Sequence, residues 1–393
     1  MFSIAAEDLE GAAIAISDNI RARHFPYGGI LDPVFAAPDS EEIVSYSRAG
    51  DSAIWTGHYL AAEAFRYKVT GAGAALQNVQ RALAGIRSLA DVTGTNLLAR
   101  AFVPADSPYA AAISSEESHN GVFRGGLDGN EVLWIGRTSR DQYCGVFFGL
   151  SVAFDMVADA EVRETVQQVG TRLLEFLLSN NWVVVMPAGQ ISTVFIGRPD
   201  QQLALLQIGR RLNPARFGTA YRKHSAALSG LVVIPIASEV LDDHNSYFKF
   251  NLDTINLFSL IRLETSARLR RVYQFAYNVL RRTTDDHGNA HFNMIDRALT
   301  RPDRRRDGET RVMLEAWLRR PRRDEFLDLR GTLPSCGQPD RACAPIPVEQ
   351  RVRTDFLWQR SPFLLFGGGE GRIETAGIDF ILPYWMARFF GVL

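Results

Sequence analysis

Four aspartates stand at or near the starts of segments that are predicted to be apolar helices: Asp51, Asp141, Asp253 and Asp379. An aspartate at a helix N-terminus can cap free N–H groups and suits the helix dipole, which contributes about 0.5–2 kcal/mol. Two carboxylates in one pocket can do glycosyl-transfer chemistry. One, protonated, donates to the leaving oxygen, and the other, ionised, acts as base or nucleophile. Capping is the simpler explanation for each aspartate alone, whereas the four together favour a site.

Aromatic and basic side chains accompany these aspartates. His58 lies one helical turn after Trp55 and could act as an acid–base group, or it could be a core histidine whose hydrogen bonds are satisfied. Arginines beside aromatic residues can bind a carboxylate, or they can form buried ion pairs with Asp355 and Asp379. Aromatic residues at helical spacing also serve as core. The candidate substrate-binding residues are Trp55, Tyr59, Arg140, Tyr143, Trp358, Arg360, Asp379, Tyr384 and Arg388, and His58 joins the catalytic candidates.

One kind of predicted helix is apolar nearly all round. No charged residue lies between Val146 and Phe154, for example, and Gly71 ends another such helix. A helix without a polar face must be buried on all sides. The segments of this kind are 51–70, 139–157, 253–263 and 383–390.

A second kind of helix is amphipathic and follows the first. In the segment after Gly71, Val79, Leu83 and Ile86 share one face and Arg81 lies outside it, as in a helix with one face in water. The segments of this kind are 73–91, 160–178 and 268–282, and further helices are predicted at 7–20, 200–211 and 309–319.

This alternation is what two concentric rings of helices require, with the inner helices buried and the outer helices facing water. We therefore predict an all-α fold, an (α/α)6 toroid of helical hairpins with a few short β-strands in loops, as a single domain over 1–393. A helical bundle or a solenoid is the alternative. The runs 182–186 and 231–234 are predicted strands, and the glycine-rich run 367–371 is predicted to be a flap over the pocket or a turn.

Composition limits the classes of function. Hydrophobic residues make up 46% and charged residues 22% of the 393 residues, with a net charge of −1, so neither disorder nor a polyanionic partner is indicated. No apolar run reaches the roughly 20 residues of a membrane span, and the N-terminal stretch is acidic where a signal peptide is basic. We expect a soluble, cytoplasmic protein, or a secreted one after removal of a signal peptide. A small-molecule substrate is expected, with no nucleic acid and no membrane.

The sequence predicts neither a metal site nor a cofactor. It has no phosphate-binding Walker loop, CxxC pair, HExxH helix or GxSxG elbow. Cys336 and Cys343 flank a loop and are either free thiols or a local disulfide that contributes about 2–3 kcal/mol. Cys144, in an apolar stretch, is predicted to be a small buried side chain.

Two stretches carry a family resemblance. Residues 51–62, DSAIWTGHYLAA, and 139–143, SRDQY, resemble the inner-helix openings of six-hairpin toroid enzymes. That group includes unsaturated glucuronyl and rhamnogalacturonyl hydrolases, related glycosidases, some polysaccharide lyases and sugar epimerases. The stretches 355–360 and 382–388 are also similar to a bacterial and fungal group of this fold to which no activity is attached. In unsaturated uronyl hydrolases two aspartates near the cavity act on a vinyl ether, and Asp51 and Asp141 best resemble them.

The resemblance implies a carbohydrate-active enzyme, a hydrolase or a lyase, acting on an acidic or unsaturated sugar with Asp51 and Asp141 as acid–base pair. A cyclase or isomerase of an isoprenoid or polyketide-type molecule is the first alternative, and an apolar cavity with one dominant carboxylic acid would favour it. A non-catalytic small-molecule-binding protein is the second, favoured if each aspartate only caps its own helix.

Overall fold

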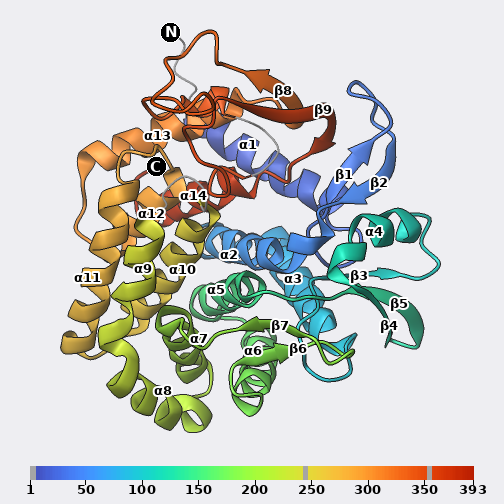
Figure 1. The fold of residues 1–393 in the computed structure, drawn as a ribbon, viewed down its shortest axis with the longest axis vertical. Coiled ribbons are helices and arrows are strands. Elements are labelled where there is room, and N and C mark those ends of the chain that lie inside the picture. The colour runs from blue at the N-terminus through green and yellow to red at the C-terminus, as the bar shows by residue number, and fades with distance from the viewer. Residues whose placement is uncertain (1–5, 242–246, 352–355) are drawn as a thin grey trace.

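The computed structural model describes residues 6–241, 247–351 and 356–393. Within these ranges the chain is mostly helical, with three small β-sheets of four, three and two strands (Figure 1). None of the helices in the described ranges is long and apolar enough to cross a lipid bilayer.

Six helices contact one another in succession. α2 packs against α5, α5 against α7, α7 against α10, α10 against α12, α12 against α14, and α14 against α2 again. The series of contacts therefore returns to the helix from which it started. These helices are α2 (Ser52–Thr70), α5 (Arg140–Met156), α7 (Pro199–Leu212), α10 (Tyr247–Leu263), α12 (Ala290–Leu299) and α14 (Ile378–Phe389).

Six more helices lie outside this series, each on one of its members: α3 on α2, α6 on α5, α8 on α7, α11 on α10, α13 on α12 and α1 on α14 (Figure 1). Their one-sided apolar faces explain this position, because such a helix buries one face and keeps the other in water. They are α1 (Ala6–Asn19), α3 (Gly73–Asp91), α6 (Ala160–Ser179), α8 (Pro214–Leu228), α11 (Ala267–Thr284) and α13 (Arg304–Leu318). The short helices α4 (Ala110–Glu116) and α9 (Val233–Val240) lie in connections.

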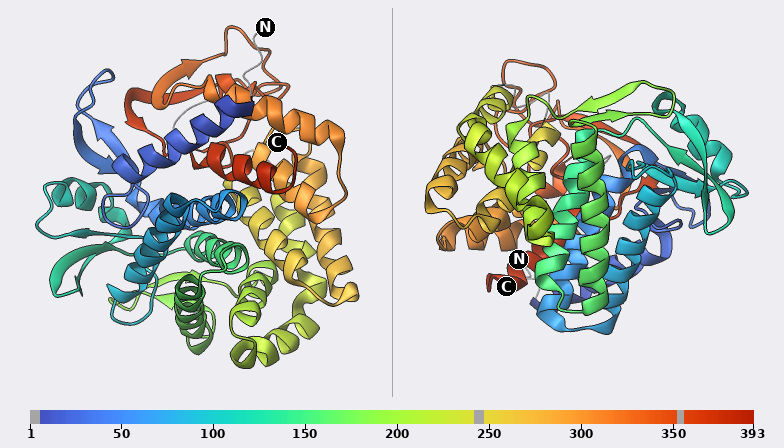
Figure 2. Two further views of the ribbon diagram at one scale, coloured as in Figure 1. Left: turned by 180° about the vertical axis from the view of Figure 1, so that it is seen from behind. Right: turned by 90° about the horizontal axis from the view of Figure 1, so that it is seen from below.

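The strands occur in the connections between helices, and β3 to β7 project from one end of the helical layer (Figure 2). The four-stranded sheet has the order β2-β1-β9-β8, and its strands are β1 (Asp32–Phe35), β2 (Ile43–Ser47), β8 (Arg323–Asp328) and β9 (Phe366–Glu374). The other sheets hold β3 (Ala101–Pro104), β5 (Asn130–Ile135) and β4 (Val122–Leu127), and β6 (Val183–Val185) with β7 (Ile191–Val194).

Most of the predicted helices are confirmed within a few residues. α2 ends where expected, with Gly71 in the left-handed conformation at φ 64° and its N–H donating to the Tyr67 carbonyl. The start predicted at Asp253 is wrong, because α10 is already helical from Tyr247, and Asp253 lies inside it. The last apolar helix likewise begins before residue 383, at Ile378, and contains Pro383.

Two further predictions are also wrong, the strand at 231–234 and the flap or turn at 367–371. The run 231–234 is helical, at the end of a short 3-10 helix and the start of α9, with Val232 and Ile236 buried at helical spacing while Ile234 is exposed. The run 367–371 is part of strand β9, which pairs with β8. A side chain at Gly368 would clash with the backbone of Glu325, so the glycines allow the two strands to approach. The strand predicted at 182–186 is confirmed as β6.

Three glycines bring α2 and α5 unusually close. An added Cβ at Gly57 would meet the backbone of Gly145, and one at Gly149 would meet the backbone of Gly57. Small residues at a helix crossing allow the two backbones to touch, so the N-terminal ends of α2 and α5 lie side by side.

The cysteines divide into two kinds. Cys336 and Cys343 form a disulfide, whereas Cys144 is a free, buried thiol whose pKa burial raises to about 12. The prediction of Cys144 as a small buried side chain is therefore confirmed, and of the two possibilities for Cys336 and Cys343 the disulfide holds.

Candidate active site

A cleft of about 590 Å³ lies at the N-terminal ends of α2, α5 and α10. Helix N-termini surround it because α5 packs against both α2 and α10. Its lining mixes charged, polar and apolar side chains: Asp51, Ile54, Trp55, Arg100, Asp141, Tyr247, Phe248, Leu252, Arg341, Gln359, Arg360, Ser361 and Leu364.

Asp51 occupies the N-cap position of α2, yet its side chain makes no capping hydrogen bond. Its Oδ1 instead accepts a hydrogen bond from Gln142 Nε2 at 3.2 Å, and Arg100 lies 3.7 Å away. With 41% of its side chain exposed, this carboxylate can meet a ligand in the cleft. The capping explanation therefore does not hold for Asp51.

Asp141 is half-buried in the first turn of α5, whose N-cap residue is Ser139. Its neighbour Gln142 joins the two helix starts, because Gln142 Oε1 accepts from the backbone N–H of Ile54 at 3.0 Å while its amide nitrogen donates to Asp51. Both aspartates therefore line one cleft on helix ends that a buried glutamine holds together.

Arg100, in the loop before β3, fixes the same two helix starts. Its guanidinium donates to the carbonyl of Gly50 and to the hydroxyl of Ser139 (2.8 Å), and its backbone oxygen accepts from Ala53 N–H (2.9 Å). Those residues immediately precede or begin α2 and α5. Sequence reasoning missed Arg100, because a single arginine in a loop carries no periodic signal.

Trp55 lines the cleft from the first turn of α2 and is 7% exposed. Its ring packs edge-to-face on His58 and Phe356, with centroids 5.1 Å and 4.9 Å away, and at a tilt on Trp358 at 6.2 Å. Trp358 is completely buried behind it and does not line the cleft. Of the two, only Trp55 lines the cleft.

His58 is completely buried and does not line the cleft. Its Nδ1 donates to the Ile54 carbonyl at 2.9 Å, which leaves Nε2 as the acceptor for the Asn251 amide at 3.1 Å. Burial lowers its pKa to about 4, so the ring is neutral at neutral pH. His58 therefore has the contacts of a core histidine whose two ring nitrogens are both hydrogen-bonded. Its side chain does not reach the cleft, as the predicted catalytic role would require.

Three further candidates do not line the cleft. Tyr143 is buried, and its hydroxyl accepts from the Leu98 N–H at 3.2 Å. Tyr59 is buried against Phe25, and burial raises its pKa well above the usual 10. Arg140 donates to the Val194 carbonyl at 3.0 Å. These contacts hold α2 and α5 to neighbouring elements.

The candidates on α14 are also remote from the cleft lining. Asp379 is buried and accepts from Arg320 (3.3 Å) and from the Leu357 N–H (2.9 Å). Arg388 donates to Glu10 and to the Tyr384 hydroxyl. Of the two possibilities for these arginines and aspartates, the buried ion pair describes Asp379, whereas Asp355 lies outside the described residues. Among the predicted anion-binding arginines, Arg140, Arg360 and Arg388, Arg360 alone lines the cleft.

Asp253 serves a different purpose from the two cleft aspartates. It is completely buried, and Arg198 donates to it at 3.0 Å, as well as to Asp200 at 2.8 Å and to Glu239. Burial and the charge of Glu239 raise the pKa of Asp253 well above its usual value. The Arg198 ion-pair cluster therefore holds α7, α9 and α10 together.

Comparison with known proteins gives a distant structural match and no sequence match. Among protein families none matches this sequence, and no curated protein sequence matches it either. Among solved structures, cellobiose 2-epimerase from Spirochaeta thermophila DSM 6192 is similar over 98% of each chain, with a TM-score of 0.44 and 9% identity. That is a distant likeness of fold.

Proposed function

We propose that this protein is a single-domain (α/α)6-toroid enzyme that acts on an acidic saccharide, with Asp51 and Asp141 as acid–base pair. The observation that carries the proposal is that both carboxylates line one cleft and that the Asp51 carboxylate makes no capping hydrogen bond. The closed series of six helix contacts, with one further helix on each member, supports the toroid.

The chemistry follows from the surroundings of the two aspartates. Arg100 forms an ion pair with Asp51 at 3.7 Å, so we assign Asp51 the base and Asp141 the proton donor. Hydrolysis of a glycosidic or vinyl ether bond needs this pair, one group protonating the substrate and the other activating water.

The remaining lining favours an anionic, hydroxylated ligand. Three arginines and two aspartates line the cleft, and Gln359, Ser361 and Tyr247 add hydrogen-bonding groups. A cyclase of isoprenoid-type molecules would instead need an apolar cavity with one dominant acid. Trp55 supplies the aromatic face on which a sugar ring can stack.

The test replaces each aspartate separately by asparagine. With a Δ4,5-unsaturated glucuronyl disaccharide and 4-nitrophenyl β-D-glucuronide as substrates, we expect Asp51→Asn and Asp141→Asn to lower kcat by about 10²–10⁴-fold. The free energy of unfolding should stay within about 2 kcal/mol of the parent. Asp303→Asn is the matched control, because Asp303 caps α13 away from the cleft and asparagine caps equally well. Full activity in either cleft variant would remove that residue from the mechanism.

A further inference from the structure

One side of the cleft is formed by two segments without helices, residues 329–346 and 359–365, which we call the cap. Backbone hydrogen bonds join the segments: Ala342 N–H to the Phe363 carbonyl (2.8 Å), Leu365 N–H to the Asp340 carbonyl (2.9 Å) and Ile346 N–H to the Pro362 carbonyl (2.8 Å). An isolated β-bridge pairs Arg341 with Leu364. The cap contributes to the cleft lining with Arg341, Gln359, Arg360, Ser361 and Leu364.

The cap has a small core of its own. Only Ala342, Ile346 and Leu365 form its buried cluster, with Leu329 and Leu333 partly buried against it. A cluster of this size cannot order a long loop by burial alone, and small units of this kind are usually stabilised by a covalent cross-link.

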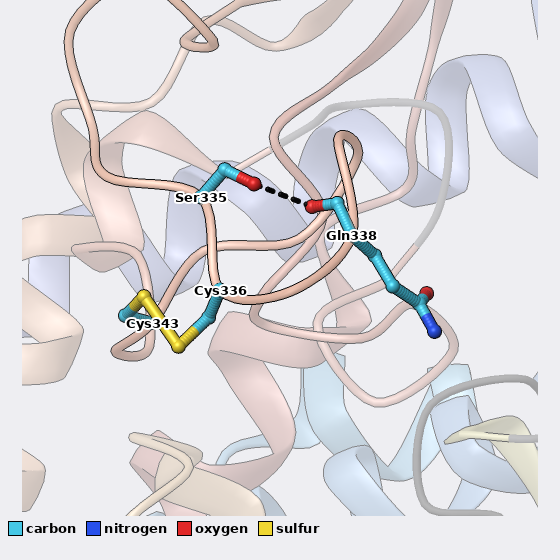
Figure 3. The surroundings of a disulfide bond; sticks show 4 residues. All are labelled: Ser335, Cys336, Gln338 and Cys343. Atoms are coloured by element: carbon cyan, nitrogen blue, oxygen red, sulfur yellow. Dashed lines mark hydrogen bonds between the residues drawn. A yellow bond between two sulfur atoms is a disulfide. The ribbon is translucent and has the colours of Figure 1, made fainter.

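That cross-link is the Cys336–Cys343 disulfide, which closes a short loop (Figure 3). Ser335, just before the loop, donates from its Oγ to the Gln338 carbonyl at 2.6 Å, and the Cys336 N–H donates to the Arg341 carbonyl at 2.9 Å. Arg341 therefore lies within the closed loop, two residues before its second cysteine.

The Arg341 side chain reaches from this loop into the cleft lining and is 17% exposed. Its Nε donates to Gln338 Oε1 at 2.8 Å, which orients the guanidinium from within the loop. The Asp340 carboxylate also lies 3.9 Å from this Nε. A guanidinium oriented from within the loop loses little further entropy when it binds a carboxylate.

We propose that Arg341 binds the carboxylate of the substrate and that the Cys336–Cys343 disulfide is the positioning element that holds it in the cleft. The binding half rests on the proposed function, since it names the group of the acidic saccharide that Arg341 meets. The positioning half rests only on the loop and its cross-link.

Two sugars that differ in charge test the binding half. By calorimetry, D-glucuronate should bind the parent protein more tightly than D-glucose. Arg341→Met should weaken glucuronate binding at least about tenfold, the usual cost of a lost charged hydrogen bond, and leave glucose binding unchanged. Arg341→Lys should recover part of the preference. Arg330→Met is the control, an exposed cap arginine that is not part of the lining. An Arg341→Met protein that keeps the parent's glucuronate-to-glucose ratio would overturn this half.

The positioning half has a readout that needs no sugar. Tris(2-carboxyethyl)phosphine reduces the disulfide to two thiols and is itself oxidised to the phosphine oxide. Trypsin should then cut the Arg341–Ala342 bond at least about tenfold faster than in the oxidised protein, because ordered backbone resists cleavage. The double variant C336S/C343S should match the reduced protein, both in cleavage and in loss of glucuronate preference. Equal cleavage rates in all three would overturn the positioning half.

The two failures are distinguishable. If the parent binds neither sugar, the proposed function and the role of Arg341 both fall, while the trypsin result still decides the role of the disulfide. If Arg341→Met loses glucuronate and C336S/C343S does not, Arg341 binds the anion without help from the cross-link.

Discussion

The two sides of the cleft are stabilised by different kinds of interaction. On one side, which we call the helical wall, Asp51, Asp141 and Arg100 are held by α2 and α5, whose crossing is part of the large hydrophobic core. On the other side, the cap holds Arg341 and Arg360 with backbone hydrogen bonds, a three-residue core and a disulfide. The geometry of the wall therefore depends on global folding, and the geometry of the cap depends on local contacts.

This difference separates two kinds of perturbation. A change in the wall should lower the stability of the whole protein, because its contacts belong to the core that forms when the chain folds. A change in the cap should open the cap alone, since subglobal regions with few buried contacts unfold locally. Each prediction below would break or sharpen that contrast, in order of expected size.

The largest effect is expected at the crossing of α2 and α5. Gly57→Ala places a methyl group against the Gly145 backbone, which cannot move without separating the helices, so the free energy of unfolding should fall by about 3–5 kcal/mol. Urea denaturation measures it. Gly308→Ala, in α13 with open space at its Cβ, is the control and should gain about 0.5–1 kcal/mol. A Gly57→Ala protein as stable as the parent would show that the crossing is not closely packed.

His58 makes the wall sensitive to pH. Its pKa is about 4 in the folded protein against 6.5 when unfolded, so the unfolded chain binds more protons between these values. The stabilisation is complete above pH 6.5 and is lost as pH falls towards 4, by about 3 kcal/mol in all. His291, whose pKa burial also lowers, adds to the same slope. Urea titrations of His58→Gln should be flatter over this window, and curves parallel to the parent's would contradict the assignment.

The disulfide should act on the cap alone. Its loop is short, with a sequence separation of 7, for which chain entropy predicts about 2–3 kcal/mol. In C336S/C343S, hydrogen exchange of amides in 336–343 should accelerate by about 30–100-fold. Amides in α2 should exchange as in the parent. Acceleration in both regions would mean that cap and wall unfold as one unit.

The smallest effect is expected at Asp253. Because its pKa is raised, its neutral form is the one the fold favours, and this acid lowers stability progressively as pH rises above 3.8. Asp253→Asn should change the free energy of unfolding by less than about 1 kcal/mol at pH 5, with the variant gaining on the parent as pH rises. Thermal unfolding from pH 4 to 8 checks this. If the stability of the variant fell relative to that of the parent with increasing pH, the raised pKa of Asp253 would be contradicted.

The two helices and two aspartates of the helical wall could be predicted from sequence, whereas Arg100 and, except for Arg360, the cap could not. An all-round apolar pattern marks α2 and α5 within a few residues, and Asp51 and Asp141 stand out because they precede such patterns. The same logic misplaced Asp253, because an aspartate inside a helix can pair with a distant arginine. Arg198 lies 55 residues away.

Arg341 has no comparable signal. Its place depends on pairing with Leu364 and on the disulfide, both of which are set by the folded neighbours and not by local periodicity. The prediction of a flap or turn at 367–371 failed for the same reason. The glycines there are typical of a turn, and the pairing of this strand with β8 and β1 cannot be seen from the local sequence. Trp358 and Tyr143 were predicted to bind substrate because they are aromatic residues near the aspartates. Both are buried and pack inside the protein instead of lining the cleft.

The contact between α14 and α2 has a consequence for how the molecule comes apart. In an open stack of helix pairs the terminal pairs have a neighbour on one side only and can fray inward. Here the last helix of the series meets the first, so the described chain offers no terminal pair from which unraveling can begin. Loss of α14 would therefore expose two flanks, those of α2 and α12, and remove far more stability than one helix contributes by itself.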